Sequence, residues 1–497
     1  MAAELKDERF GELKSNTEKP LNILMVFSDE HNSEYSGYRN HSIVETPNLD
    51  KFASESAVFT NAYCNSPLCS PSRQSFMAGL FCHEIGMWNN TCSMPEDTVT
   101  WAHALSAAGY ETSLLGKMHF NGYQKMYGFD KRPVLEGNTA GQSFYSWGIR
   151  SSHSWKDPLP YKSGKNGMND ELKKAGPDIP ERNPIFQKDL EVLQGTKDFL
   201  KEKSEDNSGK PWAACASFVL PHPPWTPRKD CFEKYKGKGD LPFNHKGEGR
   251  DTCDQYLQKF YGDVRNLSED EIKTGREAYY GLITEFDDYF GQLMDQLDQS
   301  GLAENTVVFY FSDHGEMAGK HGNWAKVSLL EDSIRIPLMI RWPGVSEANC
   351  HIDTPVSLVD LFPTFLDVPG IEWPSELPLS GNSLKPLLEK KEDEFKGTEV
   401  FCEFDGEGWN HPRALIRKGD WKYVYNHTAD HRLYNLKDDP NEMNDLSENE
   451  EFKEKLLELK EGLMRHWNPV SIEEKVIQSQ IRMSFAYNKN KCKDLGW

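Results

Sequence analysis

The chain reads LNILMVFSDEH from Leu21 to His31. The run from Leu21 to Phe27 is almost wholly apolar and has the length of a strand, and Ser28, Asp29 and Glu30 follow it. A short apolar run that ends in polar residues is typical of a strand buried on both faces, as in a parallel sheet covered by helices. We therefore expect a buried strand that brings carboxylates to one edge of a sheet.

Three further apolar runs end in the same way. They are residues 111–115 before Gly116-Lys117-Met118-His119, residues 212–220 before Pro221-His222, and residues 306–311 before Ser312-Asp313-His314. Ligands of open α/β sheets bind beyond the carboxyl ends of the strands, so these runs indicate one shared site. Apolar runs alternate with amphipathic stretches as far as about residue 380. This pattern predicts an α/β fold with a large, mostly parallel sheet flanked by helices.

Two kinds of segment connect the predicted strands. Apolar residues recur at helical spacing between Arg276 and Asp298, which predicts a long core helix whose aromatic side chains pack inside the protein. Residues from about 125 to 210 and from 228 to 275 are rich in Gly, Pro, Lys and Asp, and their periodicity is weak. We expect these two segments to be long surface excursions.

The composition of the chain changes after Pro386. Charged residues become frequent, short strands are predicted near 400–404, 414–417 and 421–425, and a helix is predicted near 451–467. We predict two domains: residues 1–385, which carry the site, and a smaller α+β domain of residues 386–497. The second domain is expected to contain an antiparallel sheet and to end in an irregular tail at Trp497.

The charge balance excludes some classes of partner. The chain has 57 Lys and Arg against 78 Asp and Glu, which gives a net charge of −21 at pH 7. Nucleic acid is therefore not an expected partner. No apolar run approaches the roughly 20 residues that a membrane-spanning helix needs, so no membrane partner is expected either.

The first twenty residues are polar and charged, without the basic and apolar regions of a secretory signal. Two compartments stay open on this basis: the chain stays inside the cell, or a signal was removed before this sequence begins. The chain has ten cysteines and no CxxC pair, which speaks against a disulfide scaffold and against a structural zinc site.

The string Cys69-Ser70-Pro71-Ser72-Arg73 combines a reactive residue with features of an anion site. Pro71 favours a helix start, which would place Cys69 at a helix N-terminus, where amide N–H groups attract anions. Arg73 lies one turn later and carries its charge at any working pH. The alternative is a small buried cysteine in a turn that contains proline.

Several other strings occur in the same order as in one known family. They are Gly116-Lys117-Met118-His119-Phe120, Pro221-His222-Pro223-Pro224, Ser312 to Met317 and His321 to Lys326. With the Cys69 motif they make the chain resemble the type I sulfatases of the alkaline phosphatase superfamily, near choline sulfatases and bacterial glycan sulfatases. The resemblance runs from Leu21 to about Gly344, with a weaker match at 431–442. It implies an alkaline phosphatase-like fold and the hydrolysis of sulfate esters.

The resemblance also implies a modified residue and a cation. In this family a dedicated maturation enzyme oxidises the cysteine of the motif to formylglycine, and here that residue would be Cys69. By the same resemblance Asp29, Cys69, Asp313 and His314 would hold a divalent cation, with calcium expected and manganese as the alternative. Much of the family has two consecutive aspartates where this chain has Asp29-Glu30. Two roles stay open for Glu30, ligation through its longer arm or only a hydrogen bond nearby, and we leave it out of the ligand set.

The catalytic roles implied by the resemblance fit the residue types. Arg73 and Lys117 would steady the hydrated aldehyde and neutralise the sulfate, and Lys326 would bind another sulfate oxygen. His119 would take a proton during the collapse of the intermediate, and His222 would protonate the leaving alcohol. Taken singly, such residues are more often structural; their shared position after strands favours the catalytic interpretation.

We therefore predict a sulfate-ester hydrolase that releases inorganic sulfate, with a sulfated mono- or oligosaccharide as the expected substrate. Three alternatives remain: a choline sulfatase, a phosphonate monoester or phosphodiester hydrolase of the same superfamily, and an inactive protein that binds a sulfated ligand. The maturation enzyme is the expected protein partner, and the oligomeric state stays open.

Overall fold

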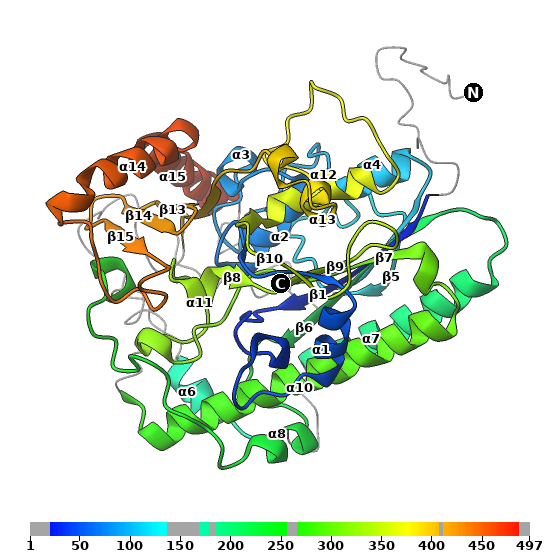
Figure 1. Ribbon diagram of the computed structural model, residues 1–497, viewed down its shortest axis with the longest axis horizontal. Helices are drawn as coiled ribbons and strands as arrows, with labels where there is room; N and C mark the ends of the chain where they lie inside the picture. The colour runs from blue at the N-terminus through cyan, green and yellow to red at the C-terminus, as the bar shows by residue number, and fades with distance from the viewer. Residues whose placement is uncertain (1–19, 137–167, 179–183, 256–265, 407–410, 487–497) are drawn as a thin grey trace.

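The computed structural model describes residues 20–136, 168–178, 184–255, 266–406 and 411–486. Its centre is an eight-stranded sheet (Figure 1). In spatial order the strands are β10 (Cys350–Ile352), β2 (Ala57–Phe59), β9 (Leu338–Arg341), β7 (Thr306–Ser312), β1 (Asn22–Asp29), β6 (Trp212–Pro221), β4 (Glu111–Gly116) and β5 (Lys131–Leu135). Only β9 runs antiparallel to its neighbours among these strands. The prediction of a large, mostly parallel sheet is confirmed.

The four predicted strands that end in ionisable residues are direct neighbours in this sheet. They lie in the order β7, β1, β6 and β4, and all three pairings are parallel. Phe27 of β1 is in register with Phe311 of β7 and with Ser217 of β6. The residues that follow the strands therefore emerge at one edge of the sheet, as expected.

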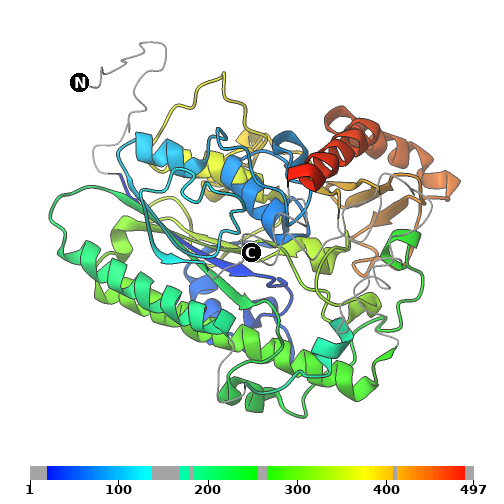
Figure 2. The same cartoon turned by 180° about the vertical axis from the view of Figure 1, so that it is seen from behind.

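Helices cover both faces of the sheet (Figures 1 and 2). The central strand β1 is therefore buried on both of its faces. Ile23, Met25 and Phe27 belong to one core cluster, while Leu24 and Val26 belong to the other. The first face is covered by α2 (Cys69–Ala78), α4 (Trp101–Ala107) and α12 (Leu361–Asp367), and the second by α1 (Pro47–Ser54), α7 (Pro184–Glu205) and α10 (Glu269–Gln299). A strand with two buried faces cannot alternate apolar and polar residues, which explains its continuous apolar run.

The long helices test two expectations. The predicted core helix is confirmed as α10, and its aromatic residues are buried. The expectation of a surface excursion is wrong for residues 184–205, which form α7 and pack on the sheet. The buried side of α7 includes the polar residues Asp189 and Thr196 among apolar ones, and these interrupt the apolar stripe that would have revealed the helix.

The C-terminal part has its own antiparallel sheet (Figure 1). Its strands are β12 (Val400–Phe404), β13 (Arg413–Lys418), β14 (Trp421–Asn426) and β15 (Arg432–Asn435), and the helices α14 (Lys453–His466) and α15 (Pro469–Ala486) follow. The antiparallel sheet is confirmed. The expectation of an irregular tail is wrong for α15, where buried Ile472 and Val476 lie one turn apart. Residues 487–497 lie outside the described part, and the domain boundary at 385 stays a prediction.

The remaining elements are short. A second sheet contains β11 (Val356–Ser357), β3 (Ala62–Tyr63) and β8 (Arg335–Ile336). Short helices are α3 (Cys82–Ile85), α6 (Met168–Leu172), α8 (Lys229–Tyr235), α11 (Glu331–Ile334) and α13 (Lys385–Leu388). Within the described residues, no helix combines the length and the apolar character needed to cross a bilayer.

Candidate active site

Cys69 is the first residue of α2, and its side chain is buried. Leu68 before it is extended, and its carbonyl accepts the first helical hydrogen bond from the Ser72 amide at 3.0 Å. Pro71 lies in the first turn, where its missing N–H leaves no helical bond unmade. The predicted position of Cys69 at a helix N-terminus is confirmed.

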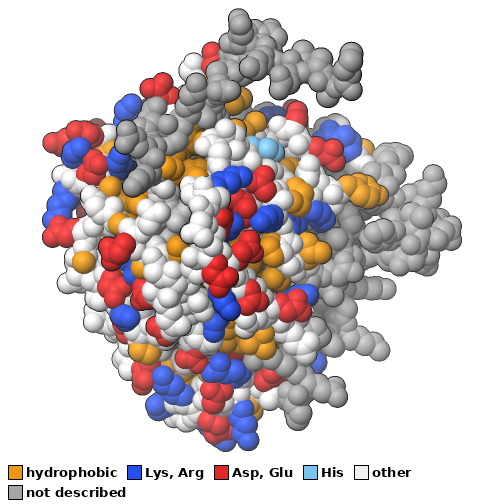
Figure 3. Space-filling view, turned by 90° about the vertical axis from the view of Figure 1, so that its right-hand side faces the viewer, with side chains coloured by type: hydrophobic (Ala, Val, Ile, Leu, Met, Phe, Trp, Pro, Cys, Tyr) orange, Lys and Arg blue, Asp and Glu red, His pale blue; other side chains and the backbone are white. Residues whose placement is uncertain are grey.

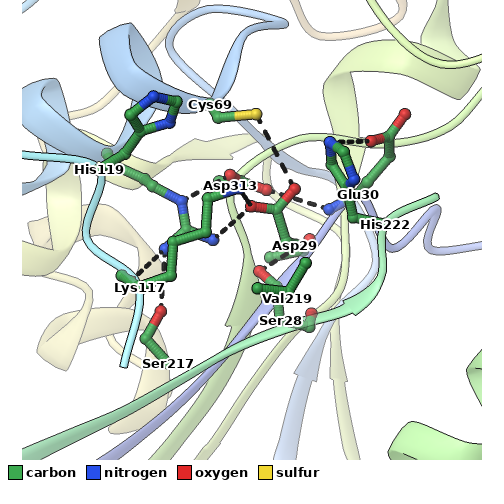
Figure 4. A network of polar contacts seen from close by, with 12 residues as sticks. Ser28, Asp29, Glu30, Cys69, Lys117, His119, Ser217, Val219, His222 and Asp313 are labelled. Atoms are coloured by element: carbon green, nitrogen blue, oxygen red, sulfur yellow. Dashed lines mark hydrogen bonds and ion pairs between the residues drawn. The ribbon is translucent and has the colours of Figure 1, made fainter. Parts of the chain in front are cut away.

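Four residues from three segments converge at the edge of the sheet, and Figure 4 shows three of them, Asp29, Cys69 and Asp313. One donor atom from each of Asp29, Cys69, Asp313 and His314 lies within 4.8 Å of all the others. Cys69 Sγ is 3.2 Å from His314 Nε2 and 3.9 Å from Asp29 Oδ1, and His314 Nε2 is 3.6 Å from Asp313 Oδ1. The structure thus brings together the four residues predicted to bind a cation.

The orientation of these side chains fits a divalent cation. His314 Nδ1 lies 3.0 Å from the Gly315 carbonyl and donates to it, which turns the lone pair of Nε2 toward the cluster. Arg73 binds the Oδ2 atoms of both Asp29 and Asp313, so that their Oδ1 atoms face the cluster. Two carboxylates and one imidazole are common ligands of divalent cations, and the donor set therefore fits such an ion.

Arg73 lies under the cluster, fully buried. Its Nη2 donates to Asp29 at 2.8 Å, its Nε to Asp313 at 2.7 Å, and its Nη1 to Ser217 Oγ at 2.9 Å. Lys117 Nζ is 2.5 Å from Asp29 Oδ2. Burial alone would raise the pKa of Asp29, but these two cations hold it well below its usual value. Asp29 is therefore ionised in the folded protein.

The surroundings of Cys69 favour an anion. Lys326 Nζ donates to Sγ at 3.2 Å, and Lys117 lies nearby. Burial by itself raises the pKa of the Cys69 thiol, but these two lysines lower it more, to well below its usual value. A negatively charged group at position 69, or an anionic ligand beside it, is stabilised by the same cations.

His222 and Glu30 lie together on one side of Asp29, with Lys117 on the other side (Figure 4). His222 Nε2 is 3.2 Å from Glu30 Oε2, and Lys326 Nζ is 2.8 Å from the same oxygen. Burial raises the pKa of Glu30 to about 8, although Lys326 and His222 lower it. Glu30 is a member of the site that the sequence motifs did not assign to a role.

His119 lies beside Cys69 on the loop after β4 (Figure 4). Its backbone is left-handed, with a φ of 60°. The amides of Met118 and His119 donate to Glu136 Oε2 at 3.1 and 2.6 Å. The carboxylate of Glu136 therefore fixes a backbone conformation that non-glycine residues rarely adopt.

Two further buried acidic side chains bind the backbone of the loops that carry His222 and Lys326. Asp189 of α7 accepts hydrogen bonds from the amides of Val219 and Leu220, just before His222. Glu316 Oε1 accepts from the amides of Ala318 and Ala325 at 2.7 and 2.6 Å, and Lys326 follows directly. Sequence patterns gave no role to Glu136, Asp189 or Glu316. Of these three residues, Glu316 alone lies in a quoted motif, Ser312 to Met317.

Comparison with known families decides the classification. The model of the sulfatase family matches residues 21–371, which is more than half of the chain. The chain belongs to the sulfatase family. The C-terminal part of this sulfatase, residues 319–468, also matches the family model described as N-sulphoglucosamine sulphohydrolase, C-terminal.

Characterised relatives are similar over nearly the whole sulfatase. It is 31% identical to the choline-sulfatase of Rhizobium meliloti over 484 residues, which cover 95% of this chain and 91% of that protein. It is 30% identical to an arylsulfatase of Clostridium perfringens, over 89% of this chain and 94% of the relative. It is therefore a sulfuric ester hydrolase.

Solved structures confirm the alkaline phosphatase-like fold. The phosphonate monoester hydrolase of Agrobacterium radiobacter superimposes with a TM-score of 0.71 at 22% identity, over 92% of this chain and 96% of that one. A protein solved in complex with its substrate D-glucosamine-2-N,6-O-disulfate also gives a TM-score of 0.71, at 23% identity, over 93% and 99% of the two chains.

Proposed function

We propose that this sulfatase hydrolyses sulfate esters of carbohydrates with a formylglycine nucleophile made from Cys69. One observation carries the proposal: the side chain at the start of α2 lies in one group with Asp29, Asp313 and His314, and Lys326 lies 3.2 Å from its sulfur. A nucleophile surrounded by cationic side chains and cation ligands suits an anionic ester.

The chemistry of position 69 explains why an aldehyde is useful there. Hydrated formylglycine carries two hydroxyl groups on one carbon. One hydroxyl attacks sulfur and the ester oxygen leaves as an alcohol, which places the sulfate on the residue. Loss of the proton from the second hydroxyl restores the aldehyde and expels inorganic sulfate. A serine would keep the sulfate as a stable ester.

The charged groups around position 69 would stabilise the transition state. A divalent cation bound by Asp29, Asp313, His314 and the modified residue 69 would polarise a sulfate oxygen and lower the pKa of the attacking hydroxyl. Lys326 lies 3.2 Å from the sulfur of residue 69 and Lys117 pairs with the neighbouring Asp29, so that both supply positive charge to the site. Arg73 keeps the two aspartates in place from below.

Two histidines would move the protons. His119 lies beside residue 69 and would accept the proton of the second hydroxyl when the aldehyde is restored. His222 would donate from Nε2 to the leaving alcohol. Its Nδ1 lies 2.6 Å from the Pro223 carbonyl, which can only accept, so Nδ1 carries a hydrogen and Nε2 is the atom that exchanges the proton.

The nucleophile is tested by making the protein together with a formylglycine-generating enzyme. We expect peptide mass spectrometry to show conversion at position 69, with sulfate release from 4-nitrophenyl sulfate in proportion to conversion. Cys69→Ala should abolish release, and chelation should remove it until calcium or manganese is restored. Undiminished turnover by Cys69→Ala would refute the proposed nucleophile. Unconverted Cys69 with tight binding of a sulfated ligand would instead indicate a binding protein.

Three findings support a carbohydrate substrate. The C-terminal part matches a family described by an N-sulphoglucosamine sulphohydrolase. A protein with the same fold was solved with a sulfated glucosamine. On the face drawn in Figure 3, lysine and arginine side chains are interspersed with aspartate and glutamate, a surface that suits a mono- or oligosaccharide better than a highly sulfated polymer. The similarity to a choline-sulfatase makes choline sulfate the second candidate.

A substrate panel separates these candidates. It contains monosaccharides with sulfate at defined positions, choline sulfate and an aryl phosphonate monoester, each scored by kcat/KM. We expect the highest value for one of the sulfated sugars. A larger value for choline sulfate would select the second candidate, and a preference for the phosphonate would overturn the assignment to sulfate esters.

A further inference from the structure

The loop after β4 carries two of the proposed catalytic residues, Lys117 and His119, and different contacts hold them. The Lys117 amide donates to the Ser217 carbonyl of β6 at 3.0 Å, and the Lys117 carbonyl accepts from Arg73 Nη1 at 2.7 Å. The backbone of Lys117 is therefore held by the edge of the sheet and by α2. The chain leaves the sheet after Lys117, so the position of His119 depends on other contacts.

The backbone of His119 decides where its imidazole lies. The ring lies beside Cys69 (Figure 4), and both of its nitrogens are buried without a hydrogen-bond partner among the described residues. No contact of this kind fixes the ring from its own end. The backbone that carries it has a φ of 60°, a conformation that a non-glycine residue keeps only where its surroundings enforce it.

A buried ion pair at the end of β5 enforces this conformation. Glu136 Oε2 accepts hydrogen bonds from the amides of Met118 and His119 at 3.1 and 2.6 Å. Arg132 Nη2 lies 3.5 Å from the other oxygen of Glu136, and Arg132 Nη1 donates to the Lys125 carbonyl of the same loop at 2.9 Å. The side chains of Arg132 and Glu136 are only 4% and 8% exposed, so water does not replace a partner that is removed.

The helix α2 binds the same stretch of backbone through its carbonyl groups. Gln74 Nε2 donates to the carbonyls of Met118 and His119 at 2.9 and 3.3 Å, and Ser70 Oγ donates to the His119 carbonyl at 3.3 Å. Ser70 follows the proposed nucleophile directly in α2. The backbone of His119 is thus fixed against the start of α2, and Glu136 supplies the hydrogen bonds to its amide side.

We propose that Glu136 is a positioning residue that holds His119 for the second half of the reaction. The inference rests on the proposed function, in which the remaining hydroxyl of sulfated residue 69 gives its proton to His119. The electrons of that O–H bond form the C=O bond of the aldehyde. The bond from this carbon to the sulfate oxygen breaks, and inorganic sulfate leaves with the electron pair. Attack on sulfur and departure of the alcohol come earlier and do not use His119.

A defect confined to the second half changes kcat and kcat/KM differently. With 4-nitrophenyl sulfate, kcat/KM covers the steps up to the release of nitrophenol, whereas kcat also includes the collapse of the intermediate. A misplacement of about 1 Å can cost about 100-fold in rate. We expect Glu136→Ala to lower kcat by about 10- to 100-fold and to change kcat/KM by less than about 3-fold. In a stopped-flow experiment, nitrophenol should appear in a burst before a steady rate slower than that of the wild type.

The experiment compares Glu136→Ala, Glu136→Gln, His119→Ala and a double alanine variant with the wild type, all with residue 69 converted to formylglycine. His119→Ala should give the same burst and lower kcat at least as much as Glu136→Ala. Adding Glu136→Ala to it should lower kcat by less than about 2-fold more, because the group that Glu136 positions is gone. Glu136→Gln keeps an oxygen that can accept from both amides, so it should recover about 3-fold or more of the lost kcat. If Glu136→Ala does not fold, Glu136→Gln is expected to give the same burst with a smaller loss.

Asp287→Ala is the matched control. Asp287 of α10 also accepts hydrogen bonds from two backbone amides, those of Asn48 and Leu49 at 3.2 and 2.8 Å, but their segment carries none of the proposed catalytic residues. Asp287→Ala should give the progress curve of the wild type. The same burst in this control would overturn the inference, because any loosened loop would then produce it.

The remaining outcomes separate the two proposals. If the converted wild type releases no sulfate, the proposed function fails, and the role of Glu136 fails with it. If the wild type is active, the proposed function stands, and two results would overturn the role of Glu136 alone. One is an equal fall in kcat and kcat/KM in Glu136→Ala, and the other is that the effects of Glu136→Ala and His119→Ala multiply.

Discussion

Replacing Arg73 by methionine removes the guanidinium that lies between two buried aspartates. Breaking a buried ion pair from one side costs about 3–5 kcal/mol, because the remaining charge is left without compensation. After Arg73→Met, Lys117 still pairs with Asp29 at 2.5 Å, and Asp313 keeps only His314 at 3.6 Å as a cationic partner among its described ion pairs. We therefore expect a loss of about 3–4 kcal/mol in the free energy of unfolding, in the lower part of that range.

Calcium should reduce this loss. A bound cation and Arg73 neutralise the same carboxylates, so their stabilising effects are less than additive. The matched control is Arg413→Met, because Arg413 is also buried between two aspartates, Asp251 and Asp254, at 3.2 and 3.1 Å. Calcium should reduce the difference in the free energy of unfolding between the wild type and Arg73→Met by about 1–2 kcal/mol. The corresponding difference for Arg413→Met should stay unchanged.

The assay is urea unfolding of the three proteins, first with a chelator and then with excess calcium. The reasoning is refuted if Arg73→Met unfolds within about 1 kcal/mol of the wild type in the chelator. It is also refuted if calcium reduces the loss in the free energy of unfolding equally for both variants, because the effect would then not arise at the predicted cation site.

Three further predictions concern stability. Burial raises the pKa of Asp189 to about 7, against 3.8 for a free side chain. The folded protein therefore keeps this proton between about pH 4 and 7 while the unfolded chain loses it, so wild-type stability falls with rising pH across that window. In urea unfolding, the free energy of unfolding of Asp189→Asn should rise relative to that of the wild type by about 2 kcal/mol between pH 5 and 7; a constant difference would contradict the shifted pKa. Gly116→Ala should lower the free energy of unfolding by more than about 2 kcal/mol, because the φ of Gly116 is 98° and a Cβ there would lie 2.1 Å from the Ser217 carbonyl oxygen. Gly109→Ala, with a φ of 91° and nothing within 4 Å, is the control and should cost about 1 kcal/mol; equal losses would exclude the close contact as the cause. Lys422 is buried and pairs with two glutamates, Glu331 and Glu442. Lys422→Met should therefore lower the free energy of unfolding by about 3–5 kcal/mol in thermal or urea unfolding. A decrease below about 1 kcal/mol would show that the pairs contribute little to stability.

Local patterns predicted the parts of the fold that depend on burial. The strands β1, β6 and β7 were predictable because a strand buried on both faces is apolar along most of its length, whereas β4 was indicated only by Leu114 and Leu115 before Gly116. The start of α2 was predictable because proline is compatible with the first turn of a helix. The helices α7 and α15 were missed. In α7 polar residues interrupt the buried stripe, and in α15 few of the residues whose burial is described, 469–482, are buried.

The residues that fix the loops of the candidate site were not predictable in the same way. Glu136, Asp189 and Glu316 act through hydrogen bonds to backbone amides, and an amide donor leaves no trace in the side-chain sequence. Their partners depend on the path of each loop, which the packing of the helices sets.

The order of residues along the chain indicated a shared site, because Asp29, Asp313 and His314 follow apolar runs and parallel strands bring such groups to one edge. Cys69 was singled out by its motif, and the resemblance to a known family joined the four residues into one ligand set; no pattern gave their distances. The pairing of Glu30 with Lys326, 296 positions later, came only from the folded chain. Contacts at that separation depend on how every intervening element packs, whereas a strand or a helix start depends on the few residues that form it.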